Sequence, residues 1–294
     1  MRPRRTAALL ALLTAAPLLT GCGGDSEASG SGSGSGTSVV TSFYPLQYVA
    51  QRVLGDRADV ANLTQPGQEP HDLELTVRQT AEVSEADVVL YEKGFQPAVD
   101  DAVEQSGPEH VVDAAATADL TGDDPHFWLD PTRLSKVAAA FETELAHADP
   151  EHADEYAANA KSLESDLAAL DRSMSRGLED CRISTIVVSH DAFGYLGRRY
   201  GLEVVGINGL SPDAEPSPSH IRELQDLIRE DKITTVFSEE LASREFADSL
   251  AGDLGIKTAV LDPIEGLSDA TADQDYLSLM RRNLRTLQRA NGCT

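Results

Sequence analysis

Residues 150–179 read PEHADEYAANAKSLESDLAALDRSMSRGLE and stand between two halves of similar length in the folded part of the chain. It is rich in Ala, Leu and Glu, which favour helices, and its interior has no Gly or Pro before Gly177. Apolar side chains recur at helical spacing, at Tyr156, Leu163, Leu167, Leu170 and Met174. The pattern predicts one long helix, roughly 40 Å at about 1.5 Å per residue. A single helix of that length predicts a rigid connection between two parts of the chain.

On each side of this helix, short β-rich runs alternate with helical stretches. We expect strands at residues 39–43, 59–63, 87–91 and 110–113 before it, and at 184–189, 203–207, 234–238 and 257–261 after it. The expected helices are 45–54, 76–86, 96–105, 192–200, 217–230, 244–254 and 273–290. Such alternation is typical of right-handed βαβ units. The chain is therefore predicted to be an α/β protein with mainly parallel sheets, in lobes at 38–149 and 180–294 joined by the helix at 150–179.

The first residues have the order of an export signal. A basic start precedes an apolar run at residues 6–18, followed by Leu19-Thr-Gly-Cys22. These last residues resemble a bacterial lipobox, which implies that residues 1–21 are removed and that Cys22 carries a lipid. An ordinary signal with an incidental Cys is the alternative. Residues 22–37, with Gly-Ser repeats, predict a flexible tether between this anchor and the folded part.

Charge and cysteine content narrow the class of protein. The formal net charge of −25 makes nucleic acid an improbable partner. After the leader, no segment approaches the roughly 20 consecutive apolar residues that a membrane span needs. With Cys22 assigned to the lipid, Cys181 and Cys293 remain, which suggests one disulfide in an oxidising compartment. Two free buried thiols are the alternative.

Metal-competent side chains follow several predicted strands. His190 and Asp262 come directly after strands, His71 lies in a turn-rich loop after another, and His126 stands between Pro125 and the aromatic pair Phe127-Trp128. Open α/β sheets bind ligands at the carboxyl ends of their strands. Three imidazoles and one carboxylate suit tetrahedral Zn(II), whereas Mn(II) and Ca(II) prefer more oxygen ligands. For each His alone, an ordinary hydrogen-bonded or surface role is the alternative, and we expect that role for His110, His147, His152 and His220.

Four motifs carry a family resemblance. They are GQEPHDLE at residues 67–74, DPHFWLDP at 124–131, SHDAFGY at 189–195 and LSPDAEPS at 210–217. Over residues 39–290 the chain resembles the zinc/manganese solute-binding proteins of bacterial ABC importers. The resemblance implies two Rossmann-like lobes with four-stranded sheets, a metal site in the cleft between them, and His71, His126, His190 and Asp262 as ligands.

The resemblance also bears on the choice of metal. Manganese-type relatives typically have a carboxylate at the position of His190, so its imidazole favours zinc. Many zinc-type relatives have a His-rich loop between the first two ligands, but residues 96–124 contain only His110. How metal is gathered without that loop stays open.

The resulting prediction is an extracytoplasmic lipoprotein, held at the outer face of the cell membrane, that captures Zn(II) and delivers it to the permease of an ABC importer. We expect a monomer without enzymatic activity. The alternatives are a Mn(II)-preferring component, a secreted adhesin with structural zinc, and a zinc hydrolase using Glu69, Glu239 or Glu240 as base. A fourth protein ligand and the lack of a His-Glu-x-x-His motif weigh against the hydrolase. Water in place of Asp262, or Glu69 as a ligand, stays possible at this point.

Overall fold

The computed structural model describes residues 36–57 and 59–294. The predicted leader, the predicted lipidation site Cys22 and the predicted tether up to residue 35 lie outside the described residues. The strands are β1 Val39–Thr41, β2 Val60–Asn62, β3 Val88–Tyr91, β4 His110–Asp113, β5 Thr185–Val188, β6 Glu203–Gly206, β7 Thr235–Ser238 and β8 Lys257–Val260. The α-helices are α1 Tyr44–Leu54, α2 Val77–Glu85, α3 Pro97–Ser106, α4 Ala114–Thr117, α5 Pro131–Ala148, α6 Ala153–Leu178, α7 Gly194–Tyr200, α8 Pro218–Glu230, α9 Glu245–Leu254 and α10 Tyr276–Asn291. Within the described ranges, no helix has the length and apolarity to cross a membrane.

Two parallel sheets form the centre of the two lobes. The N-terminal sheet has the strand order β2-β1-β3-β4, and the C-terminal sheet repeats it as β6-β5-β7-β8. All strand pairs are parallel, which confirms the predicted α/β class with two four-stranded sheets. In each sheet the chain order reverses between the two central strands, β1 and β3 or β5 and β7. Such reversal points are where open α/β sheets form ligand sites, outside the carboxyl ends of the strands.

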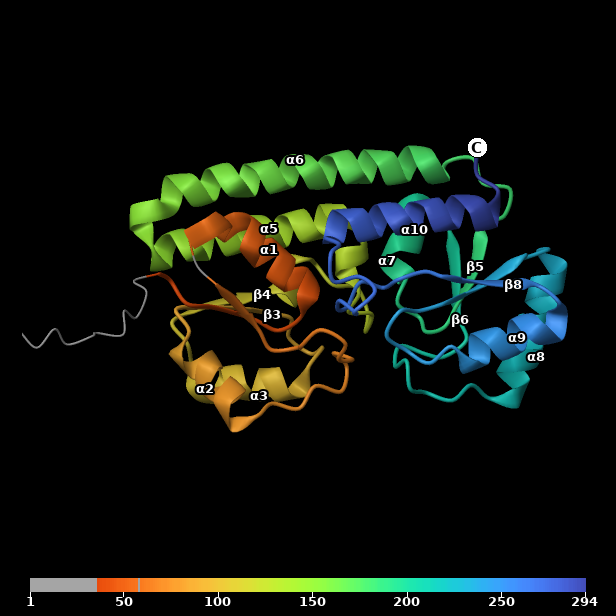
Figure 1. Cartoon of the computed structure of the whole chain (residues 1–294), viewed down its shortest axis with the longest axis horizontal. Coiled ribbons are helices and arrows are strands. Elements are labelled where there is room, and N and C mark those ends of the chain that lie inside the picture. Colours follow the sequence, from red (N-terminus) through yellow and green to blue (C-terminus); the bar gives the residue numbers. More distant parts are fainter. Residues whose placement is uncertain (1–35, 58) are drawn as a thin grey trace, which may run out of the picture. The chain divides into compact units, whose positions relative to one another are not determined.

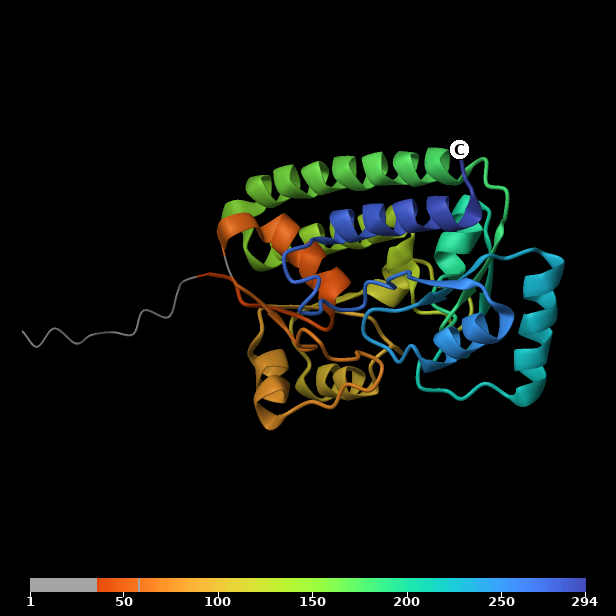
Figure 2. The ribbon, with the colours of Figure 1, turned by 45° about the vertical axis from the view of Figure 1, so that its right-hand side comes forward.

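The long helix α6 runs along both lobes. It contacts α1 and α5 of the N-terminal lobe and α10 of the C-terminal lobe, and Figure 1 shows it above these helices. The turned view in Figure 2 shows the same arrangement. Its buried residues include Leu163, Leu167 and Leu170, three of the side chains that predicted it. The helix begins at Ala153 rather than at residue 150, because Pro150–His152 forms a 3-10 turn.

Helix α5 is absent from the sequence-based prediction. It has a clear start, since Asp130 accepts a hydrogen bond from Thr132 N at 2.9 Å and Pro131 occupies the first helical turn. Its buried residues recur at helical spacing, at Leu134, Val137, Ala138, Phe141 and Leu145. This helix packs along α6 and follows the loop that carries His126, so it fixes that loop on the N-terminal lobe.

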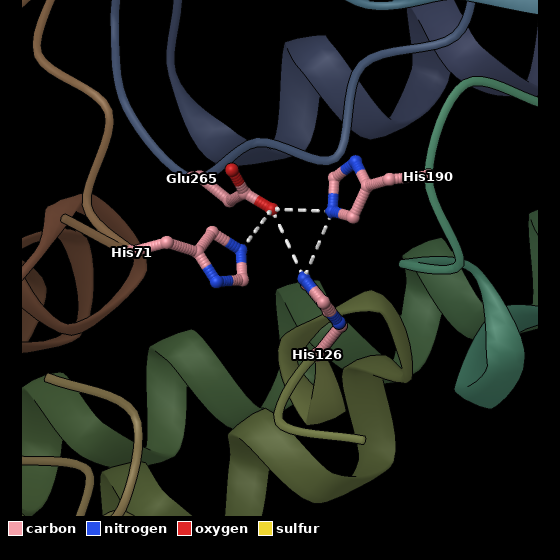
Figure 3. Close-up of side chains that lie close together, drawn as sticks. All are labelled: His71, His126, His190 and Glu265. Atoms are coloured by element: carbon pink, nitrogen blue, oxygen red, sulfur yellow. Dashed lines mark hydrogen bonds and ion pairs between the residues drawn. The ribbon is translucent and has the colours of Figure 1, made fainter. Parts of the chain in front are cut away.

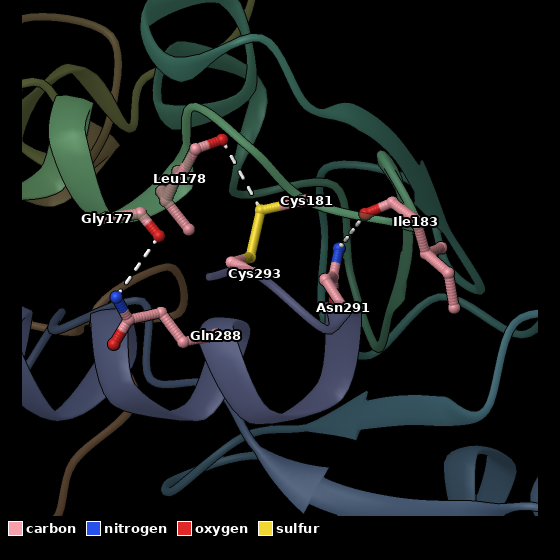
Figure 4. The surroundings of a disulfide bond; sticks show 7 residues. All are labelled: Gly177, Leu178, Cys181, Ile183, Gln288, Asn291 and Cys293. Carbon is pink, nitrogen blue, oxygen red and sulfur yellow. Dashed lines mark hydrogen bonds between the residues drawn. A yellow bond between two sulfur atoms is a disulfide. The ribbon is translucent and has the colours of Figure 1, made fainter.

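The C-terminal end of the chain is fastened to the end of α6. Cys181 and Cys293 form a disulfide that closes a separation of 112 residues, as Figure 4 shows. Beside it, Gln288 Nε2 donates to Gly177 O at 3.2 Å and Asn291 Nδ2 donates to Ile183 O at 2.8 Å. These bonds hold α10 against the long helix at the outer end of the C-terminal lobe.

Candidate metal centre

Four side chains from four separate loops meet between the two sheets. They are His71, His126, His190 and Glu265, and Figure 3 shows their ring nitrogens and one carboxylate oxygen pointing toward one another. His190 follows β5 and Glu265 follows β8, so both come from the carboxyl edge of the C-terminal sheet. His71 follows β2, and His126 stands directly before the 3-10 turn Phe127–Leu129. The carboxyl ends of the strands therefore converge on one point, as the fold predicts.

Four distances within this group are close to those of a tetrahedral zinc site. Glu265 Oε1 lies 3.1 Å from His126 Nε2, 3.3 Å from His190 Nε2 and 3.6 Å from His71 Nε2. The Nε2 atoms of His126 and His190 are 3.3 Å apart. Zinc bonds of about 2.0–2.1 Å in tetrahedral geometry place neighbouring ligand atoms about 3.3–3.4 Å apart. These four separations bracket that value, and all four ligand atoms lie within 4.8 Å of one another, so the group is compact enough to close around one zinc ion.

Two carboxylates fix the imidazole rings of the group. Asp124 Oδ1 lies 3.0 Å from His126 Nδ1, and both oxygens of Glu239 lie 2.8 Å from His190 Nδ1. A carboxylate only accepts hydrogen bonds, so Nδ1 of each ring carries a hydrogen and donates it. Each carboxylate also accepts the backbone N–H of the same His, at 3.1 and 3.0 Å. Nε2 of both rings is thereby oriented toward the centre, as metal-binding histidines require.

The environment of His71 Nε2 also suits a metal ligand. This atom is buried and has no hydrogen-bond partner among the described residues, although the ring is 15% exposed. The ring lies edge-on to Phe95, with 4.8 Å between the ring centroids. A buried nitrogen without a partner is costly unless something occupies the space in front of it. A cation at the centre of the group removes that cost.

Several buried carboxylates surround the imidazoles and change the pKa values of the site. Burial lowers the pKa of His190, but the hydrogen bonds that it donates to Glu239 and Glu265 outweigh burial and raise it to about 10. Burial raises the pKa of Glu265, yet the imidazoles of His126 and His190, together with His71 at 3.6 Å, hold it well below its usual range. Burial and the charge of Glu265 raise the pKa of Glu69 to about 8. The raised pKa values of His190 and Glu69 both include the effect of neighbouring carboxylate charge, which a divalent cation would neutralise.

Apolar side chains close one side of the group. Trp128, fully buried, lies 5.2 Å from the His126 ring, and Phe43 packs edge-on against it. The Trp128 Nε1–H donates to Pro263 O at 2.7 Å. Of the aromatic pair that follows His126 in the sequence, Trp128 thus packs beside its ring. A wall of this kind keeps water from competing for the metal.

Asp262, the carboxylate expected from the sequence, lies outside the group. Its Oδ2 accepts from Arg282 Nη2 at 2.6 Å and its Oδ1 accepts from Ile264 N at 2.8 Å. Glu265, three residues further on, occupies the expected position instead. The physical reason is the turn at Pro263-Ile264, which takes Glu265 across to the N-terminal lobe and leaves Asp262 against α10. Glu69 is also outside the group, with its Oε1 accepting from His71 N at 3.2 Å.

The carboxylates behind the rings give a first prediction. Glu239→Ala is expected to weaken zinc binding by about 10–100-fold, because removing a partner of a metal-binding His typically has that effect. Glu239→Gln keeps an acceptor for His190 and should lose less. The matched control is Glu144→Ala. Glu144 lies outside the metal group and also pairs with a histidine, with its Oε2 at 3.3 Å from His110 Nδ1. Titration of each variant against a chelator measures the effect, and equal zinc affinity in Glu239→Ala and Glu144→Ala would contradict it.

Fold and site together define a class: a two-lobed α/β protein with a candidate divalent-metal site between its lobes. The chain belongs to the family described as zinc-uptake complex component A, periplasmic, whose model matches residues 39–290. The zinc-binding lipoprotein AdcA of Streptococcus pneumoniae is 33% identical over 309 residues, which cover 97% of this chain and 60% of that protein. This chain thus spans about 60% of the length of that relative.

In two further comparisons, the similarity covers most of this chain and most of the relative. The high-affinity zinc uptake system protein ZnuA of Bacillus subtilis is 32% identical over 296 residues, covering 92% of this chain and 93% of that protein. The crystal structure of the Zn(II)-bound ZnuA-like domain of Streptococcus pneumoniae AdcA is similar with a TM-score of 0.77 and 33% identity. That similarity covers 87% of this chain and 99% of the domain, in agreement with the predicted family.

Proposed function

We propose that this protein captures Zn(II) outside the cytoplasm and delivers it to an ABC importer. The observation that carries the proposal is the group His71, His126, His190 and Glu265, whose ligand atoms lie within 4.8 Å of one another, with Glu265 Oε1 within 3.6 Å of all three imidazole nitrogens. Family membership and the zinc-related names of its relatives support the same cargo. Zinc is the cargo here, so its binding has to be tight and reversible.

The donor set supports zinc over manganese. Three imidazole nitrogens and one carboxylate oxygen form a compact site, and Mn(II) prefers more oxygen ligands. The test is a competition titration of metal-free protein with Zn(II) and Mn(II) against a chromogenic chelator. We expect zinc to bind much more tightly than manganese. Equal affinity for the two ions would refute the proposed cargo.

We further propose that the site binds without catalysis. A catalytic zinc keeps a coordination position for water, whereas Glu265 supplies a fourth protein ligand here. Two of the carboxylates considered as a catalytic base have other partners. Glu239 accepts a hydrogen bond from His190 Nδ1, and Glu240 Oε1 accepts one from Ser268 Oγ at 3.1 Å. Both observations favour storage of the ion in a closed coordination sphere.

The attachment and partners are proposals drawn from the sequence and the family. We propose that the mature chain begins at lipidated Cys22, that residues 22–37 tether the folded part to the outer face of the membrane, and that it works as a monomer with a membrane permease. Incorporation of labelled fatty acid into the full chain, and its loss in Cys22→Ala, tests the anchor. Labelling that persists in Cys22→Ala would contradict it.

Zinc affinity is expected to fall as the pH falls. Burial lowers the pKa of His126, but its hydrogen bonds to Asp124 and Glu265 raise it overall, and the pKa of His190 is raised to about 10. Both rings therefore bind protons readily before metal arrives, and zinc has to displace these protons. Between pH 7.5 and pH 5 we expect a loss of about tenfold or more per pH unit. Affinity that stays constant over this range would rule out a His-dominated site.

A further inference from the structure

Asp262 is a buried carboxylate close to the metal group but engaged elsewhere. Its side chain is 2% exposed, and it stands three residues before Glu265. Its backbone N–H donates to Asn283 Oδ1 at 3.0 Å, and its carbonyl accepts from Asn283 Nδ2 at 2.6 Å. With Arg282 on Oδ2 and Ile264 N on Oδ1, every polar group of Asp262 has a partner. This residue is therefore fixed on α10 from two sides.

The hydrogen bond from Ile264 to Asp262 holds an unusual turn. Ile264 has a φ of +60°, a left-handed conformation that β-branched residues rarely adopt. The side chain is fully buried, and the preceding carbonyl of Pro263 accepts from Trp128 Nε1 at 2.7 Å. A disfavoured backbone conformation persists only where its surroundings enforce it. Asp262 enforces it from the C-terminal lobe, and Trp128 does so from the N-terminal lobe.

This turn determines where Glu265 points. Glu265 follows Ile264 directly and places Oε1 within 3.6 Å of all three histidine Nε2 atoms. Two residues later, Leu267 O accepts from Gly67 N at 2.7 Å, on the loop that bears His71. The segment 262–267 is thus held at its start by Asp262 and at its end by the N-terminal lobe. If residue 262 were displaced, the segment would shift and move the carboxylate of Glu265 away from the three histidines.

We propose that Asp262 is a positioning residue for the metal site: it holds the turn at Ile264 that delivers Glu265, and Arg282 holds Asp262. This inference rests on the proposed zinc function. Arg282 reaches both Asp262 Oδ2 at 2.6 Å and Glu240 Oε2 at 3.7 Å, so it neutralises two carboxylates beside the site. The competing view is that Asp262 itself binds the ion, which would require it to leave Arg282 and Ile264.

The two roles predict different responses to substitution. Asparagine at position 262 keeps an oxygen for the Ile264 N–H but is a poor metal ligand, whereas alanine removes both functions. For a positioning residue we expect Asp262→Ala to lose about 10–100-fold in zinc affinity, as for other residues that orient ligands. Asp262→Asn should recover most of that loss. Arg282→Gln, which leaves the hydrogen bond to Ile264 intact, should lose less than Asp262→Ala.

The experiment measures zinc affinity and the visible spectrum of the Co(II)-loaded protein, with the fold of each variant checked by circular dichroism. Expected results are rescue by Asp262→Asn, an unchanged Co(II) spectrum in that variant, and a changed spectrum in Glu265→Gln. Equal losses in both Asp262 variants with a changed Co(II) spectrum would show that Asp262 is a ligand. Wild-type affinity in Asp262→Ala would also overturn the inference. Wild-type protein that binds no zinc would instead refute the proposed function on which the inference rests.

Discussion

Replacing His126 by alanine is expected to weaken zinc binding by on the order of a hundred- to a thousandfold. Four-ligand zinc sites bind with about 10–16 kcal/mol, so one ligand of four corresponds to about 2.5–4 kcal/mol. His126 is fully buried and its Nε2 lies 3.1 Å from Glu265 and 3.3 Å from His190. Asp124 orients the ring through Nδ1 at 3.0 Å, so the substitution removes an already positioned ligand. Isothermal titration or chelator competition measures the loss.

A matched control separates ligand loss from a general effect of removing an imidazole. His147 is 65% exposed and lies outside the metal group, so His147→Ala should bind zinc like the unmodified protein. Thermal unfolding without metal shows whether His126→Ala still folds. A folded His126→Ala protein with affinity within a few-fold of the control would mean that zinc binds elsewhere.

Removing the disulfide is expected to lower the free energy of unfolding by about 2–5 kcal/mol. The bond joins residues 112 apart, and a crosslink across a loop of about 100 residues restricts the unfolded chain by about 4.7 kcal/mol in the chain-entropy model. Strain and residual structure in the unfolded chain reduce that figure in practice. The double substitution Cys181→Ser with Cys293→Ser, compared by urea unfolding, measures the change.

Zinc affinity should be almost unaffected by this double substitution while the protein stays folded. Helix α10 has 16 residues, so about 24 Å separates the disulfide at its end from its start, where Tyr276 OH donates to Trp128 O at 2.5 Å. Gln288 and Asn291 also continue to hold the end of the helix. A large loss of affinity in the folded double variant would show that the end of α10 controls the site.

Much of the fold follows from local sequence signals. The strands and α6 were predictable because their apolar residues repeat at the spacing of one type of element, and parallel topology follows from their alternation. Helix α5 was missed although it has a cap at Asp130 and a buried stripe of its own. Its first residues overlap the motif around His126, in which Pro125 and Pro131 indicate a loop rather than a helix.

The site was predictable where a side chain directly follows a strand or a stiff turn. That rule selects the three histidines that lie together in the structure, and it selects Asp262 rather than Glu265, which lies with them. The choice between these two carboxylates depends on the backbone at Ile264, whose positive φ opposes the local preference of a β-branched residue. Tertiary contacts impose that conformation, so no local pattern predicts it. The role of Glu239 behind His190 likewise depends on the neighbouring order of β5 and β7.

Anomalous diffraction at the zinc edge, from crystals of the zinc-loaded protein, tests the central claim most directly. The structure predicts one strong peak at about 2.0–2.2 Å from His71 Nε2, His126 Nε2, His190 Nε2 and a Glu265 oxygen, with Asp262 still bound to Arg282. A peak coordinated by a different set of residues, or no peak between the lobes, would contradict it.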